Sequence, residues 1–338
     1  MKIISFLVLG LAISIGSCTS GKSSKSSSKT IDYQIAFYNV ENLFDTINQD
    51  GVNDGEYTPD NKKEWNSAKY YEKLAHIEQV LSSIDSTKTL ACVGLSEVEN
   101  RGTLDDLVQV GFLKNRGFKV VHFESPDFRG IDVAFLYDPK LFTVNDSKAI
   151  YVDLQDGEKT TRDILKVKTT GPDSQNLIMY INHWPSRWGG TEETNPKRVR
   201  AAAVLRADVD NEFELNKSAR VLIMGDLNDY PDNESVLLTL GADSVHGKQL
   251  YNATWPIHKV DSLGTHNYRG HWGTLDQIIV SSGMVSEIVD VYPFKRNFMM
   301  YQTKKGEWLP SRTYSGDKYY AGYSDHLPIV IHLKTNKK

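Results

Sequence analysis

The segment that most constrains this chain is a run of four apolar residues followed directly by a carboxylate and an amide. Val221 to Met224 is uninterrupted hydrophobic sequence, which predicts a short strand that is buried on both faces of its sheet. Asp226 and Asn228 come next, and residues 229–233 are rich in turn-forming types. A strand that ends in this way directs two oxygen-bearing side chains beyond one edge of the sheet. Such side chains suit Mg²⁺, a phosphate group and an attacking water.

Polar residues follow other predicted strands in the same way. They are Asn39 and Glu41, Glu97, Asn182 and His183, Asp276, and Asp325 and His326. Each of them alone has an ordinary explanation, such as a turn cap, a solvated acid or a histidine that is hydrogen-bonded in the core. If these strands belong to packed sheets that end at one edge, however, all of these polar residues lie together at that edge. Their occurrence in one chain therefore favours a shared functional site.

The spacing of apolar residues predicts many strands and few helices. One helix face is marked by Tyr70, Leu74, Ile77, Leu81 and Ile84, and a second by Ala202, Leu205, Val209 and Phe213. A shorter helix is expected near residues 104–113, and residues 50–66 are expected to form a surface loop. Strands are expected at residues 31–38, 89–95, 118–123, 131–137, 150–154, 164–169, 177–181, 221–224, 275–280, 285–291 and 329–333. This pattern predicts two packed sheets with helices outside them, in one α+β domain over residues 31–338.

The N-terminal sequence predicts export and a lipid anchor. Lys2 precedes an apolar run over residues 3–15, which is too short for a spanning helix and ends in Gly16-Ser17-Cys18. Small residues before a cysteine resemble a bacterial lipoprotein signal, in which residues 1–17 are removed and Cys18 carries the lipid. An ordinary signal peptide with an incidental cysteine is the alternative. Residues 18–30 are rich in Ser, Lys and Gly and are expected to form a flexible tether. The chain is therefore expected on a membrane, facing the periplasm or the cell surface.

Charge limits the ligands that such a chain can bind. The formal net charge is −4, so no overall basic surface is available to bind long tracts of nucleic acid. A polyanion must be bound by local basic residues or by a metal. Arg129 precedes one predicted strand and Arg187 follows His183, and both are candidate phosphate contacts because a guanidinium group binds phosphate in a fork. Ordinary surface ion pairs are the alternative for both.

The residues at the strand ends resemble the endonuclease/exonuclease/phosphatase superfamily, which includes DNase I-like nucleases, apurinic endonucleases, inositol-phosphate 5-phosphatases and neutral sphingomyelinases. The matching segments are Tyr38-Asn39-Val40-Glu41-Asn42, Leu95-Ser96-Glu97-Val98, Ile181-Asn182-His183, Met224-Gly225-Asp226-Leu227-Asn228, Thr274-Leu275-Asp276-Gln277-Ile278 and Ser324-Asp325-His326-Leu327-Pro328. The resemblance implies a four-layered α/β/β/α sandwich of two packed, mainly antiparallel sheets.

The resemblance also implies a role for each strand-end residue. Asn39 and Glu97 would bind the metal, and Glu41 and Asp325 would be further or second-site ligands. Asp226 and Asn228 would position the attacking water and a phosphate oxygen. His326, oriented by Asp276, would contact the phosphate or act as acid and base, and His183 would contact the phosphate or assist the leaving group. Asn182 is a candidate substrate contact, as are Arg129 and Arg187, which lie outside the matching segments. Glu41 departs from the aspartate that is common at this position in nucleases, which weakens the argument for its role as a ligand.

These expectations define an exported phosphoesterase that depends on Mg²⁺ or Mn²⁺. Phosphoryl transfer needs charge neutralisation, an oriented nucleophile and assistance to the leaving oxygen. A metal neutralises charge and activates water, and histidine is suited to proton transfer near neutral pH. The preferred interpretation is a nuclease-type phosphodiesterase, for which nucleic acid is one candidate substrate. The alternatives are a phosphomonoesterase, a sphingomyelinase-like lipid phosphodiesterase, and a non-catalytic binding lipoprotein with the same fold.

Overall fold

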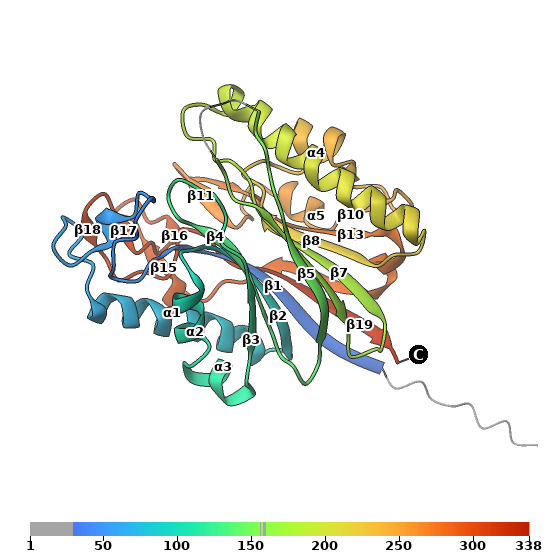
Figure 1. Cartoon of the computed structure of the whole chain (residues 1–338), viewed down its shortest axis with the longest axis horizontal. Helices are drawn as coiled ribbons and strands as arrows, with labels where there is room; N and C mark the ends of the chain where they lie inside the picture. Colours follow the sequence, from blue (N-terminus) through green and yellow to red (C-terminus); the bar gives the residue numbers. More distant parts are fainter. Residues whose placement is uncertain (1–29, 156, 158–159, 338) are drawn as a thin grey trace, which may run out of the picture.

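Two large β-sheets lie face to face, with helices on the outer face of each (Figure 1). The structure is a computed structural model that describes residues 30–155, 157 and 160–337. The predicted signal peptide, Cys18 and the tether up to residue 29 lie outside the described residues.

The first sheet has the strand order β14-β19-β1-β2-β4-β3. Only the β1–β2 pair is parallel, and the other neighbours run antiparallel. Its strands are β1 (Thr30–Leu43), β2 (Leu90–Val98), β3 (Lys119–His122), β4 (Asp132–Tyr137), β14 (Ile288–Pro293) and β19 (Ile329–Asn336).

The second sheet has the order β5-β6-β7-β8-β13-β10-β9 and is also mainly antiparallel. Its parallel pairs are β7–β8 and β9–β10. Its strands are β5 (Thr143–Ile150), β6 (Ile164–Thr170), β7 (Asn176–His183), β8 (Val221–Asp226), β9 (Ala242–Asp243), β10 (Leu250–Asn252) and β13 (Asp276–Ser281). The predicted four-layered sandwich of mainly antiparallel sheets is confirmed.

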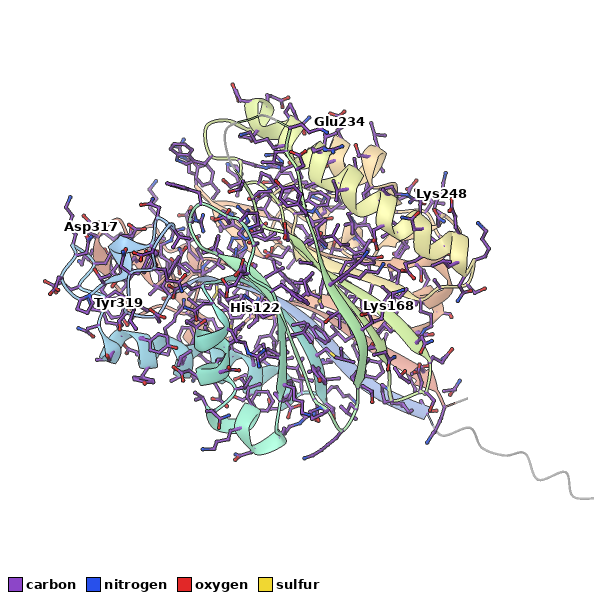
Figure 2. The ribbon with its side chains drawn as sticks, viewed as in Figure 1. His122, Lys168, Glu234, Lys248, Asp317 and Tyr319 are labelled. Carbon is purple, nitrogen blue, oxygen red and sulfur yellow. The ribbon has the colours of Figure 1, made fainter. Side chains whose placement is uncertain are left out.

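Three hydrophobic clusters fill the spaces between the four layers, and Figure 2 shows the side chains that occupy them. The outer cluster of the first sheet packs against α1 (Ser67–Asp85), α2 (Arg101–Leu107) and α3 (Gly111–Arg116). The middle cluster lies between the sheets, and the third packs the second sheet against α4 (Thr191–Leu215). All apolar residues that mark the two predicted long helices are buried in α1 and α4. The side chain of Asn66 accepts a hydrogen bond from the backbone amide of Lys69, which caps the start of α1.

Shorter elements connect the strands of the two sheets. Three hairpins pair β11 (His266–Tyr268) with β12 (His271–Gly273), β15 (Met300–Gln302) with β16 (Trp308–Pro310), and β17 (Tyr314–Ser315) with β18 (Lys318–Tyr319). Helical turns are η1 (Gly55–Tyr57), η2 (Ser235–Thr239), α5 (Trp255–His258), η3 (Ser282–Glu287) and η4 (Asn297–Met299). None of the helices in the described ranges is long and apolar enough to cross a membrane.

Some sequence predictions of secondary structure were wrong. No strand covers residues 150–154 as expected; the strand in this region is β5, which ends at Ile150. Its mostly polar sequence did not suggest a strand, because β5 lies at the edge of its sheet. The strand expected at residues 285–291 begins only at Ile288, after η3. The helix expected near residues 104–113 is two short helices, α2 and α3. The loop at residues 50–66 carries a fully buried Trp65, whose indole donates to the carbonyl oxygen of Phe44 at 3.0 Å.

The ends of β1, β2, β7 and β8 position the polar residues of the predicted rim. Both central pairs, β1–β2 and β7–β8, are parallel, so the members of each pair end at the same edge of their sheet. Four non-glycine residues at or after these ends have a left-handed backbone: Glu41 (φ 52°), Asn42 (φ 57°), Glu97 (φ 62°) and Asn228 (φ 51°). This conformation is costly for a residue with a Cβ atom, and here it turns the chain at the rim.

Candidate active site

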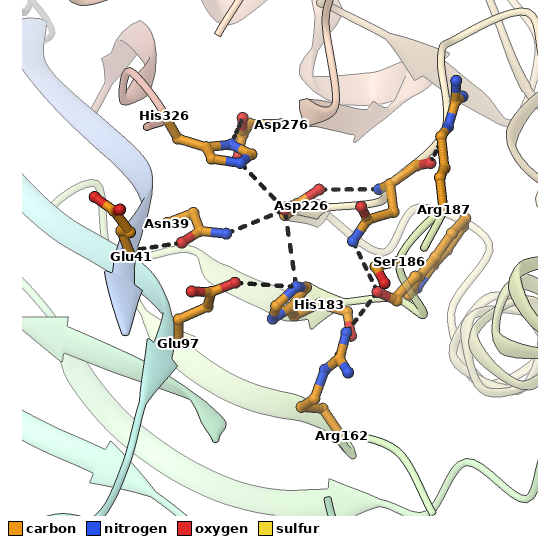
Figure 3. A network of polar contacts seen from close by, with 12 residues as sticks. Asn39, Glu41, Glu97, Arg162, His183, Ser186, Arg187, Asp226, Asp276 and His326 are labelled. Carbon is orange, nitrogen blue, oxygen red and sulfur yellow. Dashed lines mark hydrogen bonds and ion pairs between the residues drawn. The ribbon is translucent and has the colours of Figure 1, made fainter. Parts of the chain in front are cut away.

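Asp226, the last residue of β8, lies at the centre of a buried polar cluster (Figure 3). Its Oδ2 atom accepts a hydrogen bond from Nδ2 of Asn39 at 3.1 Å. The Nε2 atoms of His183 and His326 each lie 3.8 Å from the same Oδ2 atom. The side chain of Asp226 is only 3% exposed, so these groups face one another away from bulk water.

Strand register explains why these residues meet. His183 is the residue opposite Asp226 in the parallel β7–β8 pair, and Asp276 is opposite Asp226 in the antiparallel β8–β13 pair. Gly225 permits the close approach of β7, because a Cβ atom at this position would lie 2.5 Å from the carbonyl oxygen of Asn182. The pairing of β8 with β7 and β13 thus fixes the position of the carboxylate of Asp226.

His326 is bound between two carboxylates. Its Nδ1 atom lies 2.7 Å from Oδ2 of Asp276, and its backbone amide donates to Oγ of Ser324 at 3.0 Å. Burial opposes a charge on the imidazole, but Asp276 and Asp226 outweigh burial and hold the pKa of His326 well above its ordinary value. His326 is therefore positively charged at neutral pH.

The pKa of Asp226 is raised to about 6, because burial and the neighbouring carboxylate of Asp276 disfavour its charge. His326, the backbone amide of Asn228 and the amide of Asn39 act in the opposite direction. Asp226 can therefore exchange a proton near neutral pH, as a general base must.

His183 differs from His326 in its charge. Burial, together with the positive charges of Arg162 and Arg129, lowers its pKa well below the ordinary value. Its Nδ1 atom is buried without a hydrogen-bond partner among the described residues. The imidazole is neutral, and its Nε2 side faces both Asp226 at 3.8 Å and Glu97 at 3.9 Å.

The predicted metal ligands lie on one side of the cluster. Glu41, Glu97 and Asp325 line a common pocket of about 290 Å³. The Oδ1 atom of Asn39 accepts from the backbone amide of Glu41 at 3.0 Å, and Oε2 of Glu97 accepts from that of Asn42 at 3.0 Å. Carboxylate oxygens are the donors that hard divalent cations prefer, so the chemistry of these residues fits such an ion. Their ligand atoms do not all lie within 4.8 Å of one another in the structure.

Glu41 and Asp325 also make protein contacts. Oε2 of Glu41 accepts from the backbone amide of Thr313 at 2.7 Å, and burial together with Asp325 raises the pKa of Glu41 to about 7. Asp325 contacts the guanidinium group of Arg312 at 3.0 Å. Asp325, His266 and His326 form one group of potential metal-binding side chains, and Asp226, Asp276 and His326 form another.

Asn228 has a well-defined place beside Asp226. Its backbone amide donates to Oδ1 of Asp226 at 3.0 Å, and its side-chain Nδ2 donates to the carbonyl oxygen of Trp184 at 2.9 Å. Its carbonyl oxygen accepts from Nε of Arg187 at 2.7 Å. Asn228 thus joins the loops that follow β7 and β8.

The three predicted substrate contacts lie in different environments. Asn182 is fully buried and bonds to the carbonyl oxygen of Met224 and the indole of Trp184. Arg187 is engaged with the turn that follows β8, through Asn228 and Asp229. Arg129 is more open: its guanidinium group lies 3.5 Å from Oε1 of Glu97, and its side chain is 44% exposed.

Sequence reasoning missed other residues that support the cluster. Arg162 is buried and donates to the carbonyl oxygens of His183 and Trp184 (Figure 3). His266 pairs with His326 in an isolated β-bridge, and their rings lie 4.8 Å apart. Arg162 precedes a strand and His266 opens a two-stranded hairpin, so neither follows a buried strand. The available signal for Arg162 was an arginine two residues before the predicted strand that became β6.

Comparisons with known proteins identify the relatives of this chain. A family model described as "Endonuclease/Exonuclease/phosphatase family" matches residues 34–335. Among solved structures, an endonuclease/exonuclease/phosphatase family protein from Bacteroides thetaiotaomicron has a TM-score of 0.57 and 13% identity, over 91% of this chain and 99% of that one. A mannosyl-6-phosphatase of Bacteroides thetaiotaomicron VPI-5482 has a TM-score of 0.57 and 13% identity, over 89% and 99%. Truncated TDP2 of Caenorhabditis elegans has a TM-score of 0.56 and 16% identity, over 90% and 98%. No curated protein matches the chain. At these identities the structural likeness establishes the fold alone.

Proposed function

Since the chain belongs to the endonuclease/exonuclease/phosphatase family, we propose that it hydrolyses phosphate esters with the help of a divalent metal, Mg²⁺ or Mn²⁺. The observation that carries this proposal is the position of Asp226 between His183 and His326, each at 3.8 Å. A proton acceptor beside one charged and one neutral histidine can supply the base, the acid and the charge stabilisation that help the hydrolysis of a phosphate ester.

Different side chains bind the metal and activate the attacking water in this proposal. Glu97 and Asn39 would hold the metal, with Glu41 and Asp325 beside them, and the bound ion would neutralise phosphate charge and make water more acidic. Asp226 accepts the proton of the attacking water, and Asn228 orients that water and a phosphate oxygen. The water oxygen forms the new P–O bond while the bond to the leaving oxygen breaks.

The two histidines have separate tasks in this proposal. His326 carries a proton that it donates to a phosphate oxygen or to the leaving oxygen, and Asp276 holds the ring in position through its Nδ1 atom at 2.7 Å. His183 is neutral and contacts the phosphate or assists the leaving group from the opposite side of Asp226. A buried Arg162 behind His183 keeps its backbone in place.

A nuclease-type phosphodiesterase is the form of this activity that we propose first. A phosphomonoesterase and a sphingomyelinase-like lipid phosphodiesterase are the alternatives with the same groups. A protein that used the fold only to bind a ligand would not need a histidine that is hydrogen-bonded to Asp276 and lies 3.8 Å from the carboxylate of Asp226. That arrangement supports an enzyme over a binding protein.

Turnover of chromogenic esters tests the proposal directly. The protein is incubated with p-nitrophenyl phosphate or bis(p-nitrophenyl) phosphate, together with Mg²⁺, Mn²⁺ or excess EDTA. We expect release of p-nitrophenol that requires metal and is lost in Asp226→Asn, a variant of nearly unchanged size that is purified in parallel. Equal turnover by the variant, or none by the unaltered protein with either metal, would contradict the proposal.

A further inference from the structure

A polar pocket adjoins the Asp226 cluster, and it is called here the Lys63 pocket. It is the pocket of about 290 Å³ to which Glu97 and Asp325 contribute, and Lys63, Arg312 and Thr313 line it as well. Glu97 lines this pocket, and its Oε1 atom lies 3.9 Å from Nε2 of His183, so the pocket adjoins the phosphate site proposed above. A group in this pocket could belong to the same molecule as a phosphate at Asp226.

The wall of the pocket beyond Glu97 is firmly attached to the domain. Thr313 donates its backbone amide to Glu41 at 2.7 Å, and its hydroxyl accepts from the buried Nζ of Lys73 at 2.6 Å. The hydroxyl of Tyr314 donates to the carbonyl oxygen of Lys63 at 2.9 Å. The β17–β18 hairpin that follows, marked by Asp317 and Tyr319 in Figure 2, extends from this wall at one end of the molecule. The wall is thus preformed.

The aromatic rings of the pocket already have partners on their faces. Tyr57 stacks on Phe44, with ring centroids 4.2 Å apart and an interplanar angle of 10°. The Nζ atom of Lys63 lies 5.1 Å from the ring centroid of Tyr57 and 4.8 Å from that of Tyr314. Both tyrosines are less than a tenth exposed. A nucleobase needs an open aromatic face on which to stack, and these rings do not provide one.

The remaining groups of the pocket are hydrogen-bonding groups. The Nζ atom of Lys63 lies 3.6 Å from Oε2 of Glu56, which is longer than a hydrogen bond. Arg312 is 43% exposed and contacts Asp325 through one nitrogen. Lys63, Arg312 and Thr313 line the pocket together with the carboxylates that would hold a metal. These surroundings suit neither a lipid chain nor an unsubstituted aryl group, and they suit hydroxyl groups.

The size of the pocket limits its ligand to one small ring. Pockets for drug-sized ligands have volumes of about 300–1,000 Å³, and the Lys63 pocket, at about 290 Å³, lies at the lower end of this range. We propose that the Lys63 pocket binds the hydroxylated ring of a phosphorylated monosaccharide, whose phosphate group lies at Asp226 and His326. This inference rests on the proposed function, since it places the phosphate at the same site, and within that function it favours the phosphomonoesterase alternative over the nuclease-type form.

Calorimetric titration with matched ligands tests the inference. Glucose 6-phosphate and cyclohexylmethyl phosphate share the phosphate group and a six-membered ring, but only the first carries hydroxyl groups. Both are titrated, with Mg²⁺ present, into the Asp226→Asn variant, which prevents turnover of the ligand. We expect glucose 6-phosphate to bind about tenfold more tightly, which corresponds to ~1.4 kcal/mol. Lys63→Met, added to this variant, should remove most of the difference, because the side chain keeps its length over the tyrosines but loses its donors.

Lys62→Met provides the matched control. Lys62 is the exposed neighbour of Lys63 and does not line the pocket, so its replacement should leave the preference for glucose 6-phosphate intact. Thermal unfolding of each variant establishes that it is folded. Equal affinity for the two ligands, or an unaltered preference in the Lys63→Met variant, would overturn the inference. So would tighter binding of adenosine 5′-monophosphate than of glucose 6-phosphate.

The two proposals can fail separately. Metal-dependent turnover of aryl phosphates without a preference for the hydroxylated ligand would retain the proposed function and reject the sugar pocket. Lys63-dependent binding of glucose 6-phosphate, with no turnover of any ester by the unaltered protein, would retain the pocket and reject the hydrolase.

Discussion

The Nδ1 atom of His326 lies 2.7 Å from Oδ2 of Asp276, although 50 positions separate the two residues in the chain. Asp276 is the first residue of β13, in the second sheet. His326 lies in the loop that precedes β19, in the first sheet, so the contact joins the two sheets. A carboxylate in this position fixes the tautomer of the imidazole and supports its positive charge. The pair is therefore the clearest target for mutagenesis.

Replacement of Asp276 by Asn should lower turnover by roughly 10²- to 10⁴-fold, the range for residues that orient or charge a catalytic histidine. The pKa of His326 is raised in the intact pair, and the loss of the carboxylate should lower it. Any limb of the pH–rate profile that reports His326 should therefore move to lower pH. A profile of kcat and kcat/KM against pH measures both effects.

The double variant tests whether the pair acts as one unit. Asp276→Asn combined with His326→Ala should lose little more activity than His326→Ala alone, because residues that act together are not additive. Two independent losses that multiply would show that Asp276 does not act through His326. A single Asp276→Asn variant with nearly normal turnover would indicate that Asp276 only caps its strand.

Glu97→Gln should reduce turnover by roughly 10³-fold, since a metal ligand contributes several kcal/mol of transition-state stabilisation. Calorimetric titration with Mn²⁺ should show weaker metal binding, which separates this effect from misfolding. Glu99→Gln is the matched control, because burial raises the pKa of Glu99 to about 8 and the amide resembles the neutral acid. Full activity of Glu97→Gln in excess EDTA would refute the metal-binding role.

Lys166→Met should destabilise the fold by ~1–3 kcal/mol, the range for charged hydrogen bonds. Lys166 is buried under α4, where it contacts Asp208 and donates to Oε1 of Glu212 at 2.6 Å. Lys148 is half-exposed and also contacts Asp208, and Lys148→Met should cost no more than about 1 kcal/mol. Urea unfolding at neutral pH measures both losses, and an equal loss in the two variants would contradict this account.

The cost of Lys166→Met should depend on pH in a defined direction. Burial opposes the charges of Asp208 and Glu212, but lysine hydrogen bonds outweigh it and lower the pKa of both carboxyl groups. A group with a lowered pKa stabilises the fold above its unfolded pKa, near 4 for these residues. The difference between Lys166→Met and the unaltered protein should thus be complete at neutral pH and shrink as the pH falls below about 4. A difference that grows in acid would contradict the assignment.

Gly225→Ala should destabilise the fold by ~1–3 kcal/mol, as overpacking does, and should also impair turnover. The new Cβ atom would lie 2.5 Å from the carbonyl oxygen of Asn182, which forces β7 and β8 apart beside Asp226. Gly283→Ala is the control, since a Cβ atom there meets no heavy atom within 4 Å. Thermal unfolding and ester turnover of both variants distinguish a local clash from a general intolerance of alanine.

We also propose that Cys18 is the lipid-bearing first residue of the exported protein, because Gly16-Ser17-Cys18 ends an apolar segment and a polar tether follows. Stable anchoring needs more than one acyl chain, so Cys18→Ala should move the protein from the membrane fraction to the soluble fraction. Fractionation of cells in high salt, followed by immunoblotting, measures this shift. Continued sedimentation of the variant with membranes would refute the anchor.

The sequence predicted the long elements because their apolar patterns are extended. The buried helix face from Tyr70 to Ile84 spans about four turns of α1, and the four apolar residues of β8 lie at the centre of a sheet. Two- and three-residue strands such as β17 and β11 are too short to show a period of two. The edge strand β5 is largely exposed, so burial imposes little pattern on its sequence.

The candidate site was predictable only where polar residues follow buried strands. Asp226 and His183 end such strands, Asn39 lies where the regular pairing of β1 with β2 is interrupted, and the three meet in the structure. Lys73 could not be found in this way, because it lies on the buried face of a helix where a lysine interrupts the apolar pattern. Its partner Thr313 is 240 positions away, and no local pattern in the sequence indicates a contact over that distance.

The left-handed backbone at Glu41, Glu97 and Asn228 has a consequence for evolution in the laboratory. A non-glycine residue in this conformation costs ~1–3 kcal/mol, and glycine at the same position removes most of that cost. A library selected for heat resistance alone should therefore accumulate glycine at these three positions. The survivors would withstand higher temperatures and would lack three oxygen-bearing side chains of the rim, so a selection that ignores turnover would remove groups of the proposed site while it stabilises the fold.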